Sequence, residues 1–333
     1  MAVDLFPPVA VLMGGISPER EVSIASGRNV VKALKQAGFI KVFEVLIQSS
    51  GEWQINENPP LDANRAISEL KERGIACFFI ALHGTFGEDG TIQGFLETSN
   101  VPYTGSGIRA SAIGMSKSVT RAILYQAGIN IPNGDIIWNG SIEDIVSKIN
   151  NKIGFPCFIK NDDSGSSLGV YFVENKEKLI EVFNKKLVFF PFVVEEYIKG
   201  IEVTVPIIDI GKPRALTPVE IVPKERKFFD YKAKYDPQFC EEICPPKSIS
   251  PELISKIKIL AINVHKIIGC RDATRVDFII QEGVPYVLEI NTIPGMTPGS
   301  LFPKSAEAEG LGFSEAVKSM VIHAIERNKK RNG

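Results

Sequence analysis

The fold class follows from residues 9–38, whose sequence is VAVLMGGISPEREVSIASGRNVVKALKQAG. The first five residues form a continuous apolar run, which is typical of a buried strand, and two glycines follow it. Ser17 and Pro18 then supply a capping residue and a proline suited to the first turn of a helix. The buried face of this helix is predicted to comprise Val22, Ala25, Val30, Val31 and Leu34. A buried strand followed by an amphipathic helix predicts an α/β fold.

Strands and helices continue to alternate up to about residue 108. We predict strands at residues 41–47 and 76–82, and helices at residues 63–73 and 92–99. This alternation is typical of a small α/β domain with a parallel sheet. Residues 102–107 are rich in turn-forming residues and mark a boundary near residue 108. The first predicted domain is therefore residues 1–108.

The pattern after residue 108 indicates two domains of the α+β type. For residues 109–196 we predict helices at 116–128 and 176–186 and strands at 155–160, 169–173 and 192–197. For residues 197–333 we predict strands at 203–208, 217–221, 276–280 and 286–290 and helices at 251–268 and 313–327. Residues 223–247 fit neither element, because they are charged, aromatic and aperiodic over a length that compact domains rarely leave without structure. They are predicted to form a lid over a ligand, or alternatively a surface insertion.

Composition excludes several classes of function. The 333 residues carry 38 basic and 39 acidic side chains, so the chain has no broad attraction for nucleic acid or an anionic membrane. The N-terminus lacks the pattern of a signal peptide, and no apolar run approaches the length of a membrane span. The five cysteines include one C-x3-C pair without a second pair of metal ligands, which disfavours a zinc site. We therefore expect a reduced, cytoplasmic protein.

The strongest chemical signal is Arg275-Val-Asp277 followed by Glu289-Ile-Asn291. Alternate side chains of a strand share a face, so two neighbouring strands would gather these four polar groups on one side. Carboxylate and amide oxygens are ligands that Mg²⁺ prefers, and Mg²⁺ commonly binds with substrate phosphates. The pattern predicts a site for a magnesium-bound nucleotide. The alternative is the polar face of an ordinary antiparallel hairpin.

A glycine- and serine-rich turn, residues 165–169, lies between two predicted strands. Its backbone N–H groups could converge on a phosphate, and Lys160, at the end of the preceding strand, would add positive charge. It is not a Walker A loop, and a solvent-exposed hairpin turn is the alternative. Lys117 is a second candidate cation, and Glu202 is a candidate partner for ribose hydroxyls.

Two further loops follow predicted strands directly. The loop at residues 83–90 contains His83 and Glu88, and it lies where open α/β sheets bind ligands. The alternative is that His83 is a hydrogen-bonded structural residue. The loop at residues 295–300 follows the strand of Glu289, and its N–H groups could bind developing negative charge.

Taken together, these motifs resemble the D-alanine–D-alanine ligases of the ATP-grasp superfamily. The N-terminal part of the resemblance rests on GG at 14–15, SPEREVS at 17–23, HGTFGEDGTIQG at 83–94 and PYTGSG at 102–107. The remainder rests on Lys160, the turn at 165–169, Glu195 with Glu202, DYKAKY at 230–235, RVD at 275–277 and EINTIPGMT at 289–297. It covers residues 9–325. It implies a three-domain ATP-grasp ligase, with a Rossmann-like N-terminal domain and two α+β domains that clasp ATP.

The resemblance also implies the reaction. ATP would phosphorylate the carboxylate of one D-alanine, and the amine of a second D-alanine would attack the resulting D-alanyl phosphate. Phosphorylation is needed because a carboxylate has no good leaving group. The lid at residues 223–247 would exclude water from this intermediate. The product, D-alanyl-D-alanine, would serve peptidoglycan synthesis, and the expected partners are D-alanine, ATP and a second copy of the chain.

Roles are implied residue by residue. Catalytic roles fall to Glu19, Ser166, Tyr235, Arg275 and Gly295. ATP would be bound by Lys117, Lys160, Glu195, Glu196, Tyr197, Ile198, Glu202 and Lys234. The amino-acid substrates would be bound by His83, Glu88, Ser300 and Leu301. Two Mg²⁺ or Mn²⁺ ions would be held by Asp277, Glu289 and Asn291.

Three positions depart from the family pattern. Asn161 stands where proline is usual, Asp272 where glycine is usual, and Ser116 where aspartate is common. Related ligases join D-alanine to D-serine or D-lactate. The Lys234-Tyr235 pair favours D-alanine over D-lactate and excludes D-serine less firmly. A non-catalytic nucleotide-binding regulator would lack metal ligands or lid residues, and this sequence has them.

Overall fold

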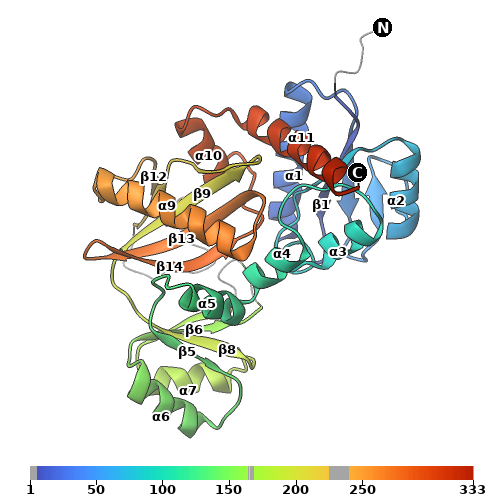
Figure 1. The fold of residues 1–333 in the computed structure, drawn as a ribbon. Helices are drawn as coiled ribbons and strands as arrows, with labels where there is room; N and C mark the ends of the chain where they lie inside the picture. The colour runs from blue at the N-terminus through green and yellow to red at the C-terminus, as the bar shows by residue number, and fades with distance from the viewer. Residues whose placement is uncertain (1–5, 164, 166–168, 225–239, 333) are drawn as a thin grey trace.

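The computed structural model describes residues 6–163, 165, 169–224 and 240–332. These residues form three sheets, each covered by helices, and Figure 1 shows the sheets lying next to one another with the smallest unit at the bottom. The mixed α/β class expected from the sequence is confirmed.

The first sheet has the strand order β3-β2-β1-β4. Its strands are β1 (Val9–Gly14), β2 (Val42–Ile47), β3 (Trp53–Ile55) and β4 (Cys77–Ile80). Strand β1 pairs in parallel with β2 and β4, as predicted, whereas the short β3 was not predicted and runs antiparallel to β2. The helices of this unit are α1 (Arg20–Gln36), α2 (Ala63–Glu72) and α3 (Thr91–Thr98).

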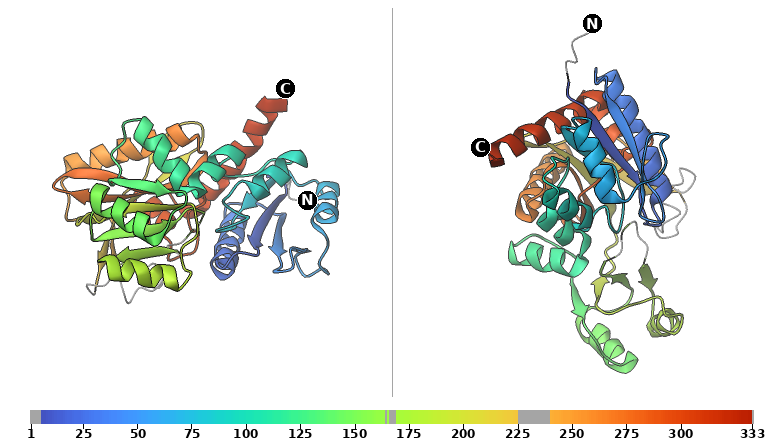
Figure 2. Two further views of the ribbon diagram at one scale, coloured as in Figure 1. Left: turned by 90° about the horizontal axis from the view of Figure 1, so that it is seen from below. Right: turned by 90° about the vertical axis from the view of Figure 1, so that its right-hand side faces the viewer.

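Both faces of the first sheet are buried, by helices from opposite ends of the chain. One face packs against α1 and the C-terminal helix α11 (Phe313–Asn332), and the other packs against α2 and α3. Figure 2 shows α11 lying alongside the first sheet and its helix α1. The C-terminal helix therefore fixes the third sheet against the first unit.

The second sheet is antiparallel, with the order β5-β8-β6-β7. Its strands are β5 (Gly134–Ile137), β6 (Cys157–Asn161), β7 (Val170–Val173) and β8 (Phe192–Glu196). Helices α6 (Ile142–Lys152) and α7 (Lys176–Asn184) share a hydrophobic core with it. Strand β5 and helix α6 were not predicted.

The third sheet has the order β12-β11-β9-β13-β14, with β10 paired to β9. Its strands are β9 (Ile201–Asp209), β10 (Pro213–Ala215), β11 (Val219–Pro223), β12 (Cys240–Ile243), β13 (Asp272–Gln281) and β14 (Val284–Asn291). The remaining helices are α4 (Ile108–Met115), α5 (Lys117–Gln126), α9 (Pro251–Ile268) and α10 (Leu301–Ala308). Helix α9 and residues of α4 and α5 pack in the core of this sheet.

Two sequence expectations need correction. Ala25, predicted for the buried face of α1, is exposed, whereas Ser23 and Ser26 are buried on that helix. Residues 223–247 were predicted to lack regular structure, but residues 240–243 form β12, which pairs antiparallel with β11. A four-residue strand at a sheet edge is too short to show periodicity, so its partner strand, rather than its own sequence, defines it. Residues 225–239, the rest of the predicted lid, lie outside the described residues.

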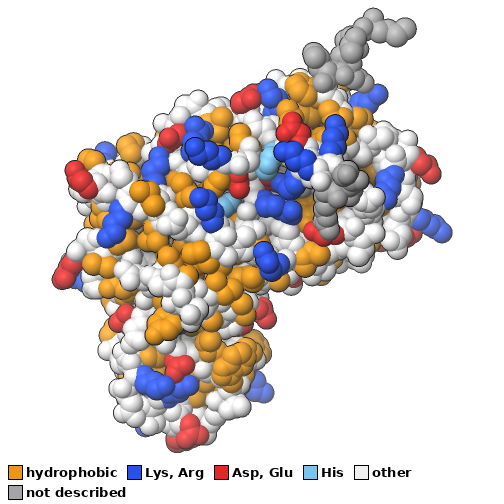
Figure 3. Space-filling model, in the orientation of Figure 1, with side chains coloured by type: hydrophobic (Ala, Val, Ile, Leu, Met, Phe, Trp, Pro, Cys, Tyr) orange, Lys and Arg blue, Asp and Glu red, His pale blue; other side chains and the backbone are white. Residues whose placement is uncertain are grey.

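Two other expectations concern the environment of the chain. Among the described residues, no helix has both the length and the apolar composition that a membrane crossing requires. All five cysteines lie in the described part of the chain, and each is a free thiol. On the face seen in Figure 3, lysine and arginine side chains gather between α9 and α11, among acidic and uncharged groups.

Candidate active site

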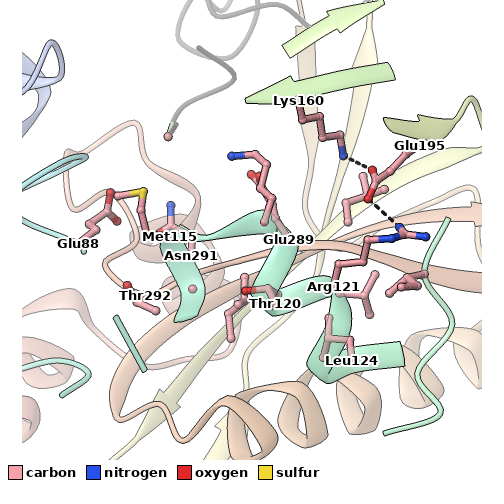
Figure 4. Close-up of a pocket in the computed structure, with 17 residues that line it drawn as sticks. Glu88, Met115, Thr120, Arg121, Leu124, Lys160, Glu195, Glu289, Asn291 and Thr292 are labelled. Atoms are coloured by element: carbon pink, nitrogen blue, oxygen red, sulfur yellow. Dashed lines mark hydrogen bonds and ion pairs between the residues drawn. The ribbon is translucent and has the colours of Figure 1, made fainter. Parts of the chain in front are cut away.

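A pocket lies where β14, α5 and the second sheet meet. It encloses about 790 Å³ including its open mouth. Six of the predicted site residues line it: Glu88, Lys117, Lys160, Glu195, Glu289 and Asn291. Figure 4 shows Glu88 and Asn291 at one end of the pocket, Lys160 and Glu195 at the other, and Glu289 between them.

The acidic hairpin has the geometry that strand alternation predicts. Strands β13 and β14 pair so that Asp277 lies opposite Glu289 and Arg275 lies opposite Asn291. Between them, Val276 and Ile290 form a pair that is buried in the core. The polar face of this hairpin therefore contributes Glu289 and Asn291 directly to the pocket.

Arg275 and Asp277 form a buried, bidentate ion pair on this face. Arg275 Nε and Nη2 donate to the two carboxylate oxygens of Asp277 at 2.8 and 2.7 Å. Thr204, on β9, donates a further hydrogen bond to Asp277. Two oxygens of one carboxylate matched to the guanidinium fork fix both side chains in orientation.

Glu195 forms the centre of a second charged group at the far end of the pocket. One of its oxygens accepts from Arg121 Nη1, on α5, at 3.0 Å, and the other pairs with Lys160 Nζ, on β6. These side chains are 8–14% exposed, so the pairs are shielded from water. Sequence reasoning missed Arg121, although it follows Lys117 by one helical turn and therefore faces the same way.

The residues that follow Glu195 have other surroundings. Glu196 accepts from the backbone N–H of Asn133 at 2.7 Å, and the ring of Tyr197 lies 5.4 Å from that of Phe172. Ile198 is buried, and Glu202, on β9, lies between β11 and β13. Among the described residues, these four are not part of the pocket lining. Their predicted roles in binding ATP stay predictions.

Glu19 and Glu88 approach each other at the other end of the pocket. Glu19 precedes α1 and is 4% exposed, and a Cβ atom at Gly84 would lie 2.5 Å from its Oε2. The backbone N–H of Gly84 donates to Glu88 Oε2 at 2.6 Å. Burial, with the charge of Glu19 nearby, raises the pKa of Glu88 to about 8. Gly165 also lies beside Glu19, so the predicted phosphate turn begins next to this carboxylate.

His83 connects its own loop with helix α1 and the loop of Met296, and among the described residues it does not line the pocket. Its Nε2 shares a hydrogen bond with Ser26 Oγ at 3.0 Å, and Ser26 Oγ accepts from the backbone N–H of Met296 at 3.2 Å. Burial lowers the pKa of His83 to about 4, so the ring is neutral at pH 7. Asn29 donates to the carbonyl of Met296 at 2.7 Å. Ser26 and Asn29 were not predicted, because nothing in the spacing of α1 indicates a partner 270 residues away.

The loop of Gly295 is held together by Ser300. A Cβ atom at Gly295 would lie 2.7 Å from Ser300 Oγ, so a larger residue there would force Ser300 to move. Ser300 Oγ accepts from the backbone N–H of Thr297 at 3.1 Å, and Leu301 begins α10. The structure thus places Gly295, Ser300 and Leu301 together, after the strand that carries Glu289.

The departures from the family pattern make specific contacts. Ser116 caps α5 and donates to Asp162 at 2.9 Å. The side-chain amide of Asn161 donates to the carbonyl of Leu187 at 2.9 Å, and its oxygen accepts from the N–H of Phe189 at 3.1 Å. The backbone N–H of Asn161 also donates to Gly169 at 2.9 Å, a bond that proline could not make.

Asp272, the third departure, has a left-handed backbone with φ of 57° and no exposed surface. Its carboxylate accepts from the backbone N–H of Gly105 at 2.6 Å, from His323 Nδ1 at 2.9 Å and from Arg327 Nη1 at 2.8 Å. It joins the first unit, α11 and β13.

The remaining predicted residues cannot be placed. Ser166, Lys234 and Tyr235 lie outside the described residues. Within the described ranges, no three carboxylate, histidine or cysteine side chains gather as a metal cluster. The predicted ligand set, two carboxylates and the amide of Asn291, consists of oxygen donors only, and such donors suit a hard divalent cation.

Comparison with known proteins decides the family. Residues 8–106 match the family model of the D-ala D-ala ligase N-terminus, and residues 123–322 match that of the D-ala D-ala ligase C-terminus. The chain belongs to the D-alanine–D-alanine ligase family. It is 40% identical over 329 residues to the D-alanine–D-alanine ligase of Carboxydothermus hydrogenoformans, with 97% of this chain and 99% of the relative covered. It is 38% identical over 322 residues to that of Desulforudis audaxviator, covering 96% and 99% of the two chains.

Solved structures of family members have the same fold. The D-alanine–D-alanine ligase of Coxiella burnetii superposes with a TM-score of 0.82 at 27% identity, covering 98% of this chain and 96% of its own. The ligase of Bacillus anthracis, solved with ATP, superposes with a TM-score of 0.77 at 31% identity, covering 98% and 99%. The ATP-grasp ligase fold implied by the sequence motifs is thereby confirmed.

Proposed function

We propose that this family member is an ATP-dependent D-alanine–D-alanine ligase, which forms D-alanyl-D-alanine through a D-alanyl phosphate intermediate. The observation that carries the proposal is the pocket itself. Its lining includes carboxylate and amide side chains of β14, cationic side chains of α5 and β6, and the buried Glu88. A magnesium-bound nucleotide and a zwitterionic amino acid together require this combination of charges.

ATP would lie along the pocket with its base at the Glu195 end. Lys117 and Lys160 line the pocket as cations for the phosphates, and Lys234 belongs to the same proposed set. Asp277, Glu289 and Asn291 fit two Mg²⁺ or Mn²⁺ ions by the chemistry of their oxygen donors. Such ions neutralise charge on the β- and γ-phosphates during phosphoryl transfer. Glu196, Tyr197, Ile198 and Glu202 would complete the nucleotide site.

The amino-acid substrates would lie toward Glu19 and Glu88. The Glu19 carboxylate is suited to the ammonium group of the first D-alanine, and the protonated Glu88 can donate a hydrogen bond without adding charge. Arg275 and the backbone of Gly295 would stabilise the oxyanion of the second step. Ser300 and Leu301 would receive the second carboxylate, and Ser166 with Tyr235 would close the lid onto Glu19.

The domain limits 1–108, 109–196 and 197–333 belong to the same proposal, as do a homodimer and a cytoplasmic location. These rest on the family resemblance. The experiment that tests the function is ADP release by the purified chain with ATP and Mg²⁺, measured with D-alanine, D-serine and D-lactate as second substrates. We expect release that depends on D-alanine.

Two outcomes would overturn this reading. A strong preference for D-lactate or D-serine would make the chain a ligase of the related kind. ATP binding without any D-alanine-dependent ADP release would instead favour a nucleotide-binding regulator on the same scaffold.

A further inference from the structure

Arg121 is the one charged residue, among the described residues that line the pocket, to which the family motifs assign no role. It lies on α5, one turn after Lys117, and its guanidinium contacts Glu195 at the base end of the pocket. The side chain is 12% exposed, so it is committed to this site rather than to solvent.

The site is shaped to receive this guanidinium. Strand β5 pairs with β8 so that Gly134 lies opposite Glu195. A Cβ atom at Gly134 would lie 3.1 Å from Arg121 Cζ and Nη2, and 2.2 Å from the carbonyl oxygen of Val194. Glycine at this register position therefore leaves the space that the guanidinium occupies.

The two cations on Glu195 differ in what they can do when a nucleotide binds. Lys160 is a point charge on a flexible stem, and phosphates would attract it away from Glu195. The planar guanidinium of Arg121 packs against Gly134 of β5, and this packing restricts its movement away from Glu195. When Lys160 turns to the phosphates, Arg121 is the group that still neutralises and orients the Glu195 carboxylate.

A carboxylate held in this way accepts hydrogen bonds and donates none. Adenine presents an exocyclic amine, a donor, at the position where guanine presents a carbonyl oxygen, an acceptor. We propose that Arg121 is a positioning residue that fixes Glu195 as an acceptor for the adenine amine, and that it thereby makes the enzyme select ATP over GTP. This inference rests on the proposed function, because it takes the pocket to be the nucleotide site.

The test is the binding of ATP and GTP, each with Mg²⁺ and without D-alanine, measured by titration calorimetry. We expect the intact chain to bind ATP at least tenfold more tightly than GTP. Arg121→Met should weaken ATP binding about tenfold and GTP binding much less, so that the preference largely disappears. Arg121→Lys, which restores a charge but not the fork, should recover part of the preference.

Kinetics separate positioning from a structural role. In Arg121→Met the KM for ATP should rise, while kcat at saturating ATP and the KM for D-alanine stay within about twofold of the intact chain. The matched control is Lys152→Met. Lys152, on α6, forms an ion pair at 3.2 Å with Asp135 of β5, and both lie outside the described pocket lining. This substitution should leave both nucleotide affinities unchanged.

Three results would overturn the proposal. One is an intact chain that binds ATP and GTP equally, and another is an Arg121→Met chain that loses both affinities by the same factor. The third comes from Glu195→Gln, in which Arg121→Met should have no further effect on the ATP preference, so an undiminished effect would refute action through Glu195. Glu195→Gln and Arg121→Lys keep the test valid if Arg121→Met does not fold. Because binding is measured without D-alanine, selectivity can hold even if the proposed ligase reaction fails.

Discussion

Strand β13 carries two carboxylates that arginines hold, one at its start and one near its middle, but the two arginines come from different places. At the start of the strand, Asp272 is paired with Arg327 of α11, 55 residues away. Five positions further along, Asp277 is paired with Arg275 of its own strand. Asp272 has no exposed surface, whereas Asp277 is 8% exposed and lies across from the pocket-lining Glu289.

The difference shows how one interaction can serve structure or chemistry. Asp272 joins three segments of the chain and has no exposed surface, so removing its carboxylate would leave the guanidinium of Arg327 and the ring of His323 without this partner. Asp277 makes its hydrogen bonds within its own sheet, to Thr204 and Arg275. These two side chains stay in place when Asp277 binds another group instead. We infer that the start of β13 holds the units together, whereas its middle serves the proposed metal site.

The largest effect on activity is expected at Glu289, which lines the pocket opposite Asp277. Glu289→Gln keeps the size of the side chain but removes one charge from the proposed metal site, so turnover should fall about 1000-fold or more. Steady-state ADP release measures this. The free energy of unfolding should change by less than about 1 kcal/mol, since the side chain is not fully buried.

The control for this change is Glu282→Gln, on the exposed turn of the same hairpin, which should leave turnover unchanged. Near-normal turnover in Glu289→Gln would contradict the proposed role of Glu289 in binding the metal.

The largest effect on stability is expected at Asp272, at the start of β13. Asparagine tolerates the left-handed backbone of residue 272, so Asp272→Asn adds no backbone strain while it removes the charge and replaces one acceptor oxygen with a donor. The free energy of unfolding should fall by about 3–5 kcal/mol, because Arg327 and His323 lose their buried partner. Urea denaturation measures the loss, and turnover of the folded fraction at low temperature should persist.

Glu315→Gln is the matched control, because Glu315 makes an exposed ion pair with Lys318 on the same helix. It should cost less than about 1 kcal/mol. If both substitutions were equally mild, burial would not be what distinguishes Asp272.

The sequence could predict what depends on neighbouring residues. Alternation along β13 and β14 placed Arg275, Asp277, Glu289 and Asn291 on one face, and the pairing register confirms it. The contacts of Asp272 could not be predicted, because Gly105 is 167 residues away and nothing local indicates it. Arg121 was missed for a similar reason, since its helical face gives its direction but not its partner on β8.

A third buried carboxylate, Glu88, has its pKa raised by burial and by the nearby charge of Glu19, so it should make stability depend on pH. Its pKa is raised by burial from 4.5 to about 8, so the folded chain binds a proton that the unfolded chain has lost between these values. The free energy of unfolding therefore falls as pH rises through this range. His83, with its pKa lowered from 6.5 to about 4, acts in the opposite direction below pH 6.5.

Between pH 6.5 and 8 only Glu88, of these two groups, contributes. The free energy of unfolding should fall by on the order of 1 kcal/mol per pH unit across this window. Urea denaturation at several pH values measures it, and Glu88→Gln should flatten the slope in this window. A slope that is equally steep in the variant would assign the effect to other groups.

The smallest effect is expected at Asn161, which like Asp272 replaces the usual residue of the family and joins separate segments. Asn161→Ala removes the side-chain bonds to Leu187 and Phe189 but keeps the ladder bond to Gly169. These bonds are neutral and open to water, which can replace them, so the free energy of unfolding should fall by only about 1 kcal/mol. Thermal and urea denaturation measure the change, with Asn151→Ala, at a 3.4 Å surface contact, as the control. A loss as large as that of Asp272→Asn would mean that joining segments, rather than burying a charge, gives Asp272 its importance.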